Sequence, residues 1–289
     1  MNPSAAATAN EALPGSDMAN KLLVGPIRLA AKTLWDLTIE GLENIPADGP
    51  AILTPNHLSF CDSVFVPVSL PRRMWAIGKG EYMDDWKTKF IFPALGMIPV
   101  DRSGGDAAQV ALNAAARVLD AGNLFMMYPE GTRSRSGHLH KGRTGPARLS
   151  LRCGAPIVPV GHQGTVAVQP PDYPLMKPFK KVTVRFGAPM RVEDHGDPDD
   201  PRTMRIFTDA VMFQVAQLSG QQYVHTYANA PEPETTDVGP TSPASTGATS
   251  PASSGAGIPT PPGRIALPPR RPVPIVDIRS ASTAPAIAP

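Results

Sequence analysis

Residues 51–62 read AILTPNHLSFCD, and this stretch indicates both the kind of fold and where its functional edge lies. The run Ala51–Thr54 is largely apolar without strict alternation, which is typical of a strand that is covered on both faces of its sheet. His57 follows this strand closely. We therefore expect it at the carboxyl end of the strand, where α/β sheets bind their ligands.

Strand and helix patterns alternate along the chain outward from that stretch. The predicted strands cover 51–54, 74–77, 124–128, 157–160 and 182–186, and the predicted helices cover 59–68, 84–90, 106–120, 143–152 and 201–218. This order predicts an α/β fold with a central, largely parallel mixed sheet that is flanked by helices. A P-loop, a dinucleotide-binding glycine motif and a GxSxG nucleophile elbow are absent from the sequence.

Composition divides the 289 residues into four segments. We expect a disordered N-terminus over 1–17, an amphipathic helix over 18–38 and a single folded domain over 39–227. The tail 228–289 holds 14 of the 35 prolines, with many Ser, Ala and Thr and no aromatic residue. Such a segment buries too little apolar surface to order itself, so it is predicted to be disordered.

Charge and cysteine content exclude several classes of protein. The net charge is +2 and the pI about 8.6. With few aromatic residues and no basic stripe, this argues against a nucleic-acid partner. Two cysteines suit neither a disulfide framework nor a metal cluster and favour a reduced, cytosolic environment. The first residues lack the pattern of a signal peptide, and no apolar run is long enough to span a bilayer, so membrane contact is expected to be peripheral.

The segment Met18–Leu37 is predicted to be an amphipathic helix. Its apolar stripe comprises Leu23, Ile27, Ala30, Leu34 and Leu37, and its opposite, cationic side comprises Lys21, Arg28 and Lys32. Pro26 is expected to kink or start the main segment, and Trp35 sits between the two faces. Two interpretations stay open: the helix packs on the core of the domain, or it lies on a membrane surface, where an interfacial indole is favourable.

His57 and Asp62 have the spacing of a base and its orienting acid. An imidazole accepts a proton at neutral pH, and a carboxylate in the first turn of the following helix can fold back onto Nδ1 and leave Nε2 for the substrate. A structural histidine is the alternative. The neighbouring Cys61 is a candidate nucleophile, with a core position on the helix as its alternative.

A second cluster of functional residue types occupies Tyr128–Arg135, which reads YPEGTRSR. Gly131 allows close backbone approach, and the planar guanidinium of Arg133 suits a phosphate group. Glu130 cannot bind an anion, so we expect it to anchor the loop through backbone amides or a neighbouring Arg. The preceding apolar run directs this segment to the same sheet edge as His57, although a solvated turn is the alternative.

Two cations stand between these motifs in the sequence. Lys79 lies in AIGKGEY and Arg102 in GMIPVDR, and each follows a strand-like stretch. Both are candidates for the same edge, with ordinary surface charge as the alternative.

Taken together, NHLSFCD, GKGEY, GMIPVDR, YPEGTRSRSG and IVPVG resemble the four blocks of the glycerolipid acyltransferases, in particular the 1-acyl-glycerol-3-phosphate acyltransferase family, over about residues 40–190. The resemblance implies that 39–227 is an acyltransferase domain and that His57 is the catalytic base with Asp62 as its partner. It implies that the acceptor site is formed by Glu130, Gly131, Thr132 and Arg133, and that Lys79 and Arg102 bind phosphate or the oxyanion. Val158 and Pro159, in the fourth block, are implied in acyl-donor binding or strand packing. Tyr128 replaces the usual Phe of the family.

The function implied is transfer of a fatty acyl group from acyl-CoA or acyl carrier protein to the free hydroxyl of 1-acyl-glycerol-3-phosphate, which yields phosphatidic acid. No metal or redox cofactor is implied. The protein is expected on the cytoplasmic face of the cell membrane as a peripheral protein. Another acceptor (glycerol 3-phosphate, another lysophospholipid or a glycolipid) and a non-catalytic lipid-binding protein are the alternatives.

Overall fold

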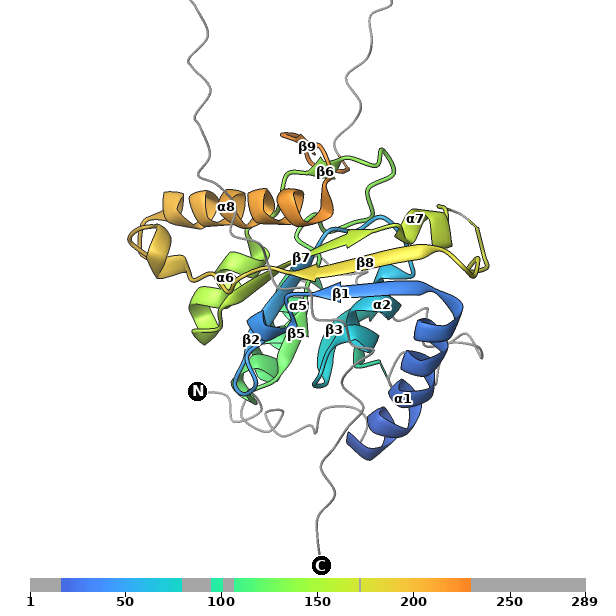
Figure 1. Ribbon diagram of the computed structural model, residues 1–289. Helices are drawn as coiled ribbons and strands as arrows, with labels where there is room; N and C mark the ends of the chain where they lie inside the picture. Colours follow the sequence, from blue (N-terminus) through green and yellow to red (C-terminus); the bar gives the residue numbers. More distant parts are fainter. Residues whose placement is uncertain (1–16, 80–94, 101–106, 172, 230–289) are drawn as a thin grey trace, which may run out of the picture. The chain divides into compact units, whose positions relative to one another are not determined.

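The computed structural model of the protein describes residues 17–79, 95–100, 107–171 and 173–229 (Figure 1). The predicted helix over 84–90 lies outside these ranges. So do nearly all of the predicted N-terminal segment 1–17 and the predicted tail from residue 230 onward.

A mixed sheet is the centre of the domain, with the strand order β1-β8-β7-β2-β5-β3-β4 (Figure 1). Its strands are β1 (Asp36–Glu40), β2 (Ala51–Pro55), β3 (Met74–Lys79), β4 (Met97–Val100), β5 (Leu124–Met126), β7 (Ile157–Gln163) and β8 (Lys181–Phe186). The neighbours from β7 to β4 are parallel; β8 runs antiparallel to β7, and β1 is parallel to β8. The predicted α/β fold with a largely parallel mixed sheet is therefore confirmed. Strands β6 (Leu139–His140) and β9 (Tyr223–Val224) pair separately.

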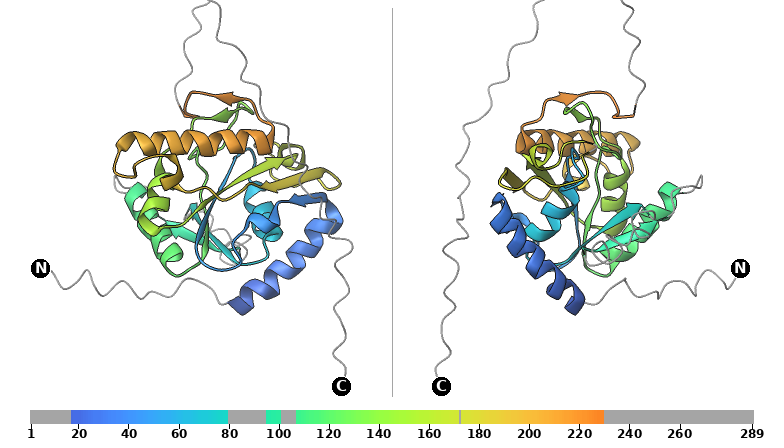
Figure 2. Two further views of the ribbon diagram at one scale, coloured as in Figure 1. Left: turned by 60° about the vertical axis from the view of Figure 1, so that its left-hand side comes forward. Right: turned by 90° about the vertical axis from the view of Figure 1, so that its right-hand side faces the viewer.

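Helices cover both faces of this sheet (Figure 2). They are α1 (Asp17–Leu34), α2 (Asp62–Ser69), α5 (Ala107–Asp120), α6 (Gly145–Cys153), α7 (Thr165–Val168) and α8 (Pro201–Ser219), with short 3-10 turns at Leu42–Asn44 and Val192–His195. Side chains alternate between the two faces, as the period of two in a strand requires. In β2, Leu53 joins the hydrophobic cluster beneath α1 and α2, whereas Ile52 joins the cluster beneath α5, α6 and α8.

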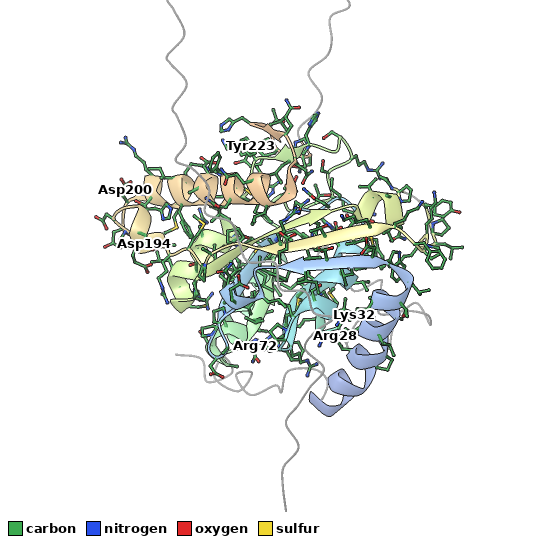
Figure 3. All side chains as sticks on the ribbon, in the orientation of Figure 1. Arg28, Lys32, Arg72, Asp194, Asp200 and Tyr223 are labelled. Carbon is green, nitrogen blue, oxygen red and sulfur yellow. The ribbon has the colours of Figure 1, made fainter. Side chains whose placement is uncertain are left out.

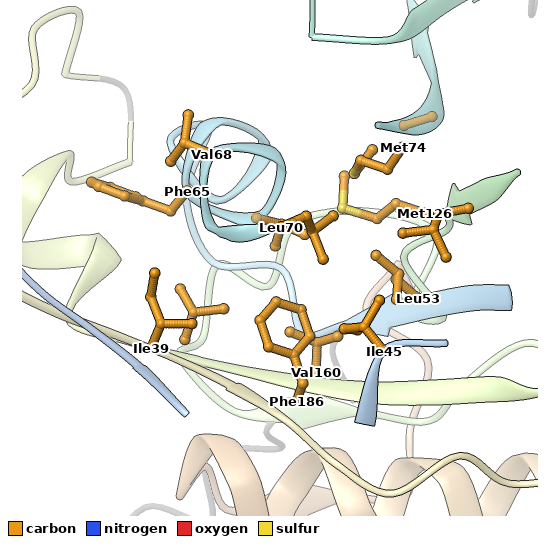
Figure 4. Close-up of a cluster of buried hydrophobic side chains, with 14 of the residues drawn as sticks. Ile39, Ile45, Leu53, Phe65, Val68, Leu70, Met74, Met126, Val160 and Phe186 are labelled. Atoms are coloured by element: carbon orange, nitrogen blue, oxygen red, sulfur yellow. The ribbon is translucent and has the colours of Figure 1, made fainter. Parts of the chain in front are cut away.

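The hydrophobic cluster beneath α1 and α2 packs the sheet against α2, the helix that follows the loop with His57. Phe65 and Leu70 from the α2 segment pack with Leu53, Met126 and Phe186 of the sheet, and all five are nearly or fully inaccessible to solvent (Figure 4). Burial of side chains of this size is worth about 1.5–3 kcal/mol each. The position of α2, and hence of the residues at its start, is therefore fixed by the core.

The N-terminal helix is shorter than predicted. It ends at Leu34, and Leu37 belongs to β1 rather than to an apolar helical stripe. Strand β1 forms because Asp36–Glu40 pairs along its whole length with β8, which is far away in the sequence. Tertiary pairing of this kind overrides the helical pattern of the preceding residues. Pro26 lies within α1 rather than at its start.

Part of the predicted stripe faces solvent. Val24 and Ala31 are buried, and Ile27 packs against the core, but Leu34 is 40% exposed and Ala30 is also exposed. The side chains of Lys21 and Leu23 lie outside the described part of the chain. The inward stripe of α1 is therefore rotated relative to the prediction.

Polar contacts also fix α1 to the domain. Arg28, predicted on a free cationic side, donates Nε to the carbonyl oxygen of Val68 at 2.8 Å and Nη2 to that of Leu70 (Figure 3). Trp35 donates its indole N–H to the carbonyl oxygen of Lys177 at 2.8 Å, and its ring meets Phe65 edge-on at 5.5 Å. The inward side of α1 thus packs on the core, and only its outward side is available for other contacts.

Helix α8 approaches the sheet closely at Gly161 in β7, and a substitution there tests this packing. A Cβ at this position would lie 2.4 Å from the carbonyl carbon of Leu218. We expect Gly161→Ala to lower the free energy of unfolding by about 1–3 kcal/mol, because the helix backbone has to move away from the strand. Urea unfolding followed by circular dichroism measures this. Gly25→Ala is the matched control, since in the described part of the chain no atom outside its own helical turn lies within 4 Å of the added methyl group. An equal effect in both variants would contradict the close packing of α8.

Candidate active site

The two sequence motifs meet at one edge of the sheet. Strands β2, β5 and β3 are parallel neighbours, so their carboxyl ends lie side by side. His57 follows β2 and Tyr128 follows β5. The two loops are joined through their backbones: the amide of Ser134 donates to the carbonyl oxygen of His57 at 2.8 Å. Residues about seventy positions apart in the chain therefore form one site, as the sequence predicts.

His57 and Asp62 form a hydrogen-bonded pair. The Nδ1 atom of His57 lies 3.1 Å from Asp62 Oδ2, and the side chain of His57 is 14% exposed while that of Asp62 is fully buried. The same carboxylate oxygen accepts the backbone amides of Leu58 at 2.7 Å and Ser59 at 2.8 Å. The aspartate thus fixes both the imidazole and the loop that carries it. With Nδ1 engaged, Nε2 is the ring nitrogen that remains for another partner.

The charge of Asp62 is stabilised in this buried place. Burial by itself raises the pKa of a carboxyl group. The hydrogen bond from His57, the nearby imidazoles of His162 and His57 and the amide of Ser59 outweigh that effect, so the pKa of Asp62 lies below its usual range. Asp62 is therefore ionised at neutral pH, as a carboxylate that orients and stabilises an imidazolium has to be.

Tyr128 holds the imidazole from one face. Its ring stacks on His57 with a centroid separation of 3.7 Å and an interplanar angle of 11°. Its hydroxyl group is 2.8 Å from Ser63 Oγ, on the first turn of α2. Burial, with a contribution from the charge of Asp62, raises the pKa of this phenol well above its ordinary value, so the hydroxyl stays protonated. The tyrosine ring therefore covers one face of the imidazole, and its hydroxyl group links it to α2.

Glu130 anchors the loop that follows β5. Its carboxylate is 1% exposed and accepts two backbone amides, that of His57 at 3.2 Å on Oε1 and that of His140 at 3.0 Å on Oε2. This is the anchor through backbone amides that the sequence predicts. Desolvation, which outweighs the two amides, raises the pKa of Glu130 to about 7. Both oxygens already have backbone partners, so the contribution of Glu130 is to hold the loop that forms the site.

Cys61 does not have the properties of a nucleophile. It is fully buried, and its Sγ donates to the carbonyl oxygen of Thr165 at 3.4 Å. Burial raises the pKa of the thiol to about 12, so the reactive thiolate is scarce at neutral pH. Of the two alternatives for Cys61, the structure favours the core position.

A cavity of about 580 Å³ opens beside His57. Gly131, Thr132 and Arg133 line its mouth, where all three are exposed. Its interior is mainly apolar and runs over the sheet toward α5. Among the described residues, this part is lined by Ala76, Ile77, Gly78, Met97, Ala108, Ala111, Leu112, Phe125, Met126 and Met127. The volume is that of a typical small-molecule site, with cations at one end and hydrocarbon at the other.

Arg143 is a site residue that the sequence analysis missed. It lines the same cavity as His57 and Arg133, and its Nε would lie 3.0 Å from a Cβ at Gly131. Its guanidinium donates to Asn229 Oδ1 at 2.8 Å and lies 5.2 Å from the ring centroid of Tyr227. The sequence analysis selected cations that follow an apolar, strand-like stretch. Arg143 lies ten residues beyond Arg133 and does not follow such a stretch, so only the density of basic residues in KGR could have indicated that it belongs to the site.

Three predictions about other site residues have different outcomes. The backbone of Lys79 ends β3, at the same edge as His57, while its side chain is not described. Arg102 lies outside the described residues. Val158 and Pro159 are buried in β7, where they pair with Leu53 and Thr54 of β2, so strand packing is the alternative that the structure favours for them.

Comparison with known proteins agrees with this geometry. The acyltransferase family profile matches residues 36–163, which include both loops and the His57–Asp62 pair. The similarity to the acyltransferase family thus extends over residues 36–163. The crystal structure of the 1-acyl-sn-glycerophosphate acyltransferase of Thermotoga maritima superposes with a TM-score of 0.56 at 25% identity, covering 70% of this chain and 82% of that one.

Three curated relatives are named as 1-acyl-sn-glycerol-3-phosphate acyltransferases. The chain is 29% identical to a chloroplastic 1-acyl-sn-glycerol-3-phosphate acyltransferase of Arabidopsis thaliana (47% of this chain, 38% of the relative). It is 33% identical to a 1-acyl-sn-glycerol-3-phosphate acyltransferase of Limnanthes douglasii (50% and 51%) and 28% identical to the alpha form of Homo sapiens (52% and 54%). The chain thus spans about half or less of the length of these relatives. In the described part of the chain, none of the helices has the length and apolar character needed to cross a membrane.

The raised pKa of Glu130 makes the stability of the folded domain depend on pH. Between its ordinary value of 4.5 and about 7, the folded state holds the proton more tightly than the unfolded chain does. The stabilising contribution is therefore present below pH 4.5 and is lost as the pH rises through 7. We expect the wild type to lose about 2–3 kcal/mol relative to Glu130→Gln between pH 4.5 and pH 8.

Urea unfolding of both proteins at these two pH values measures this difference. The comparison cancels the opposite contribution of His162, whose pKa is lowered by burial. Parallel pH profiles of the two proteins would show that folding does not raise the pKa of Glu130.

Proposed function

We propose that the protein is a 1-acyl-glycerol-3-phosphate acyltransferase, which moves a fatty acyl group from a thioester donor to the free hydroxyl group of its acceptor and forms phosphatidic acid. One observation carries the proposal: the His57–Asp62 pair opens on the same cavity as Arg133 and Arg143. A base and two guanidinium groups at one cavity mouth suit an alcohol that also bears a phosphate group. The activity for which these relatives are named supports this choice of acceptor.

In the proposed reaction, the acceptor hydroxyl donates a hydrogen bond to His57 Nε2 while the guanidinium groups hold its phosphate. His57 removes the proton as the oxygen attacks the thioester carbonyl. The imidazolium that forms is stabilised by ionised Asp62, 3.1 Å away at Nδ1. Backbone amides or Lys79 stabilise the tetrahedral oxyanion. Its collapse breaks the carbon–sulfur bond, and the proton on His57 returns to the leaving thiolate.

The apolar part of the cavity is the proposed place of an acyl chain. It begins at His57 and extends over Phe125 and Met97 toward α5, so a thioester at the cavity mouth would direct its hydrocarbon inward. Burial of each methylene group in such a cavity contributes about 0.8 kcal/mol. Acyl-CoA and acyl carrier protein both present a chain in this way, and both stand as donors in the proposal. We place the protein on a membrane surface as a peripheral protein, on the cytoplasmic face.

Removal of the base tests the proposed mechanism. We expect His57→Ala to lower the turnover number by about 10²–10⁴-fold, because positioned base catalysis contributes a factor of that size. Asp62→Asn should have an effect of similar size through loss of the orienting charge. Release of free thiol from acyl-CoA in the presence of lysophosphatidic acid measures the rate. Cys61→Ala is the matched control and should retain turnover. His57→Ala should also keep the melting temperature and acceptor binding; retained activity in that variant would contradict the proposal.

Removal of a guanidinium group tests the choice of acceptor. We expect Arg133→Ala and Arg143→Ala each to raise the KM for lysophosphatidic acid at least about tenfold, since a charge-assisted hydrogen bond is worth about 1.5–3 kcal/mol. With monoacylglycerol, which lacks the phosphate group, the same variants should match the wild type. Arg148→Ala, on the exposed side of α6, is the control. An equal loss with both acceptors would show that neither guanidinium group recognises the phosphate.

A further inference from the structure

The loop between α7 and β8 exposes an aromatic side chain on a strained backbone. Phe179 is 80% exposed, the most of any large hydrophobic residue in the described part of the chain. Within that part it is also the one residue other than glycine with a positive φ, at 59°. Bulky side chains rarely adopt this left-handed conformation, and glycine adopts it without strain. Neither folding nor the proposed chemistry accounts for a phenylalanine here.

Further apolar side chains surround Phe179. In the same loop, Leu175 is 68% exposed and Tyr173 is 46% exposed. The loop is tied to the end of α1, because the amide of Phe179 donates to the carbonyl oxygen of Leu34 at 2.6 Å and Trp35 donates to that of Lys177. Figure 1 shows this loop next to the carboxyl end of α1. We call the exposed side chains of Leu34, Tyr173, Leu175 and Phe179 the apolar tip.

Lysines surround the apolar tip. Residues 32–36 and 173–181 contain four lysines, all exposed, and a single acidic residue, Asp36. The lysines are Lys32, Lys177, Lys180 and Lys181. The ammonium group of Lys177 lies 4.8 Å from the ring centroid of Tyr173. Long lysine side chains beside exposed apolar groups match the boundary of an anionic lipid surface, where the hydrocarbon enters and the ammonium groups reach the phosphates.

The apolar tip is continuous with the candidate active site. A second cavity, of about 240 Å³, is lined by Tyr173 and Pro174 of this loop and also by Phe60 and Arg133. Arg133 also lines the cavity that contains His57. A lipid held at the tip would therefore meet the guanidinium group of Arg133 on its way to the imidazole.

We propose that the apolar tip docks the protein onto an anionic lipid membrane, with Phe179 and Leu175 inserted among the acyl chains and the surrounding lysines on the headgroups. This inference deepens the proposed function and rests on it for the lipid nature of the acceptor. It adds the loop between α7 and β8 to the membrane contact predicted for the helix over 18–38, whose outward side, with Leu29 67% exposed, stays available. The inward side of α1 packs on the core and is not available for lipid.

The substitution Phe179→Gly separates a membrane role from a structural one. Glycine relieves the backbone strain and removes the aromatic ring at the same time. We expect the partition coefficient of the full chain on vesicles of equal parts phosphatidylglycerol and phosphatidylcholine to fall about tenfold, since one inserted aromatic ring contributes about that factor. The melting temperature should stay the same or rise. Flotation and thermal unfolding measure the two quantities.

Two further proteins complete the experiment. Phe213→Ser removes a ring that is 54% exposed on α8 and should leave vesicle binding unchanged. The double variant Lys177→Gln, Lys180→Gln should lose binding to the anionic vesicles and not to vesicles of phosphatidylcholine alone. Unchanged flotation of Phe179→Gly would overturn the proposal. It would also be overturned if the loss appeared equally in Phe213→Ser, or if Phe179→Gly only converted a dimer to a monomer.

An assay with an acceptor that is dissolved as monomers, without vesicles, separates membrane docking from acyl transfer. With a short-chain lysophosphatidic acid that stays monomeric, Phe179→Gly should transfer acyl groups at the wild-type rate. If the wild type binds vesicles through Phe179 but transfers no acyl group, the proposed function fails and the docking surface stands.

Discussion

The adjacency of β2 and β5 is the constraint on which the candidate site depends. It brings the loop after each strand to the same edge, and the buried carboxylate of Glu130 joins them through the amides of His57 and His140. These two amides lower the pKa of Glu130, and burial still raises it to about 7, so they hold its position more than its charge. His57 and the cationic cavity mouth are therefore held together by hydrogen bonds to the backbone, independently of any bound ligand.

The local part of this arrangement was predictable from the sequence. The strand before His57, the helix that begins at Asp62 and the loop after β5 all follow from patterns within about a dozen residues. The pairing of His57 with Asp62 needed only five residues of separation. The anchoring role of Glu130 followed from the chemical unsuitability of a carboxylate for binding an anion.

Features that depend on distant pairing were not predictable in the same way. Strand β1 forms because β8 offers its edge, and the preceding helical pattern concealed it. Arg143 enters the site because Tyr227 and Asn229, more than eighty residues away in the chain, hold its guanidinium group. No pattern in the sequence around Phe179 predicts its positive φ or its exposure. Both depend on the end of α1, whose Leu34 carbonyl oxygen accepts the amide of Phe179. Spacing within one segment carries no information about such partners.

The ring of Tyr128 has a consequence for the direction of attack. Because it covers one face of the imidazole at 3.7 Å, and Asp62 occupies the Nδ1 edge, a nucleophile can reach Nε2 only along the ring plane from the cavity side. In the proposed reaction, this approach fixes the direction of the O–H bond that is deprotonated and so which lone pair of the oxygen faces the electrophile. Where an acceptor has neighbouring alcohols, the one that reaches this plane while the guanidinium groups hold the phosphate would then be acylated.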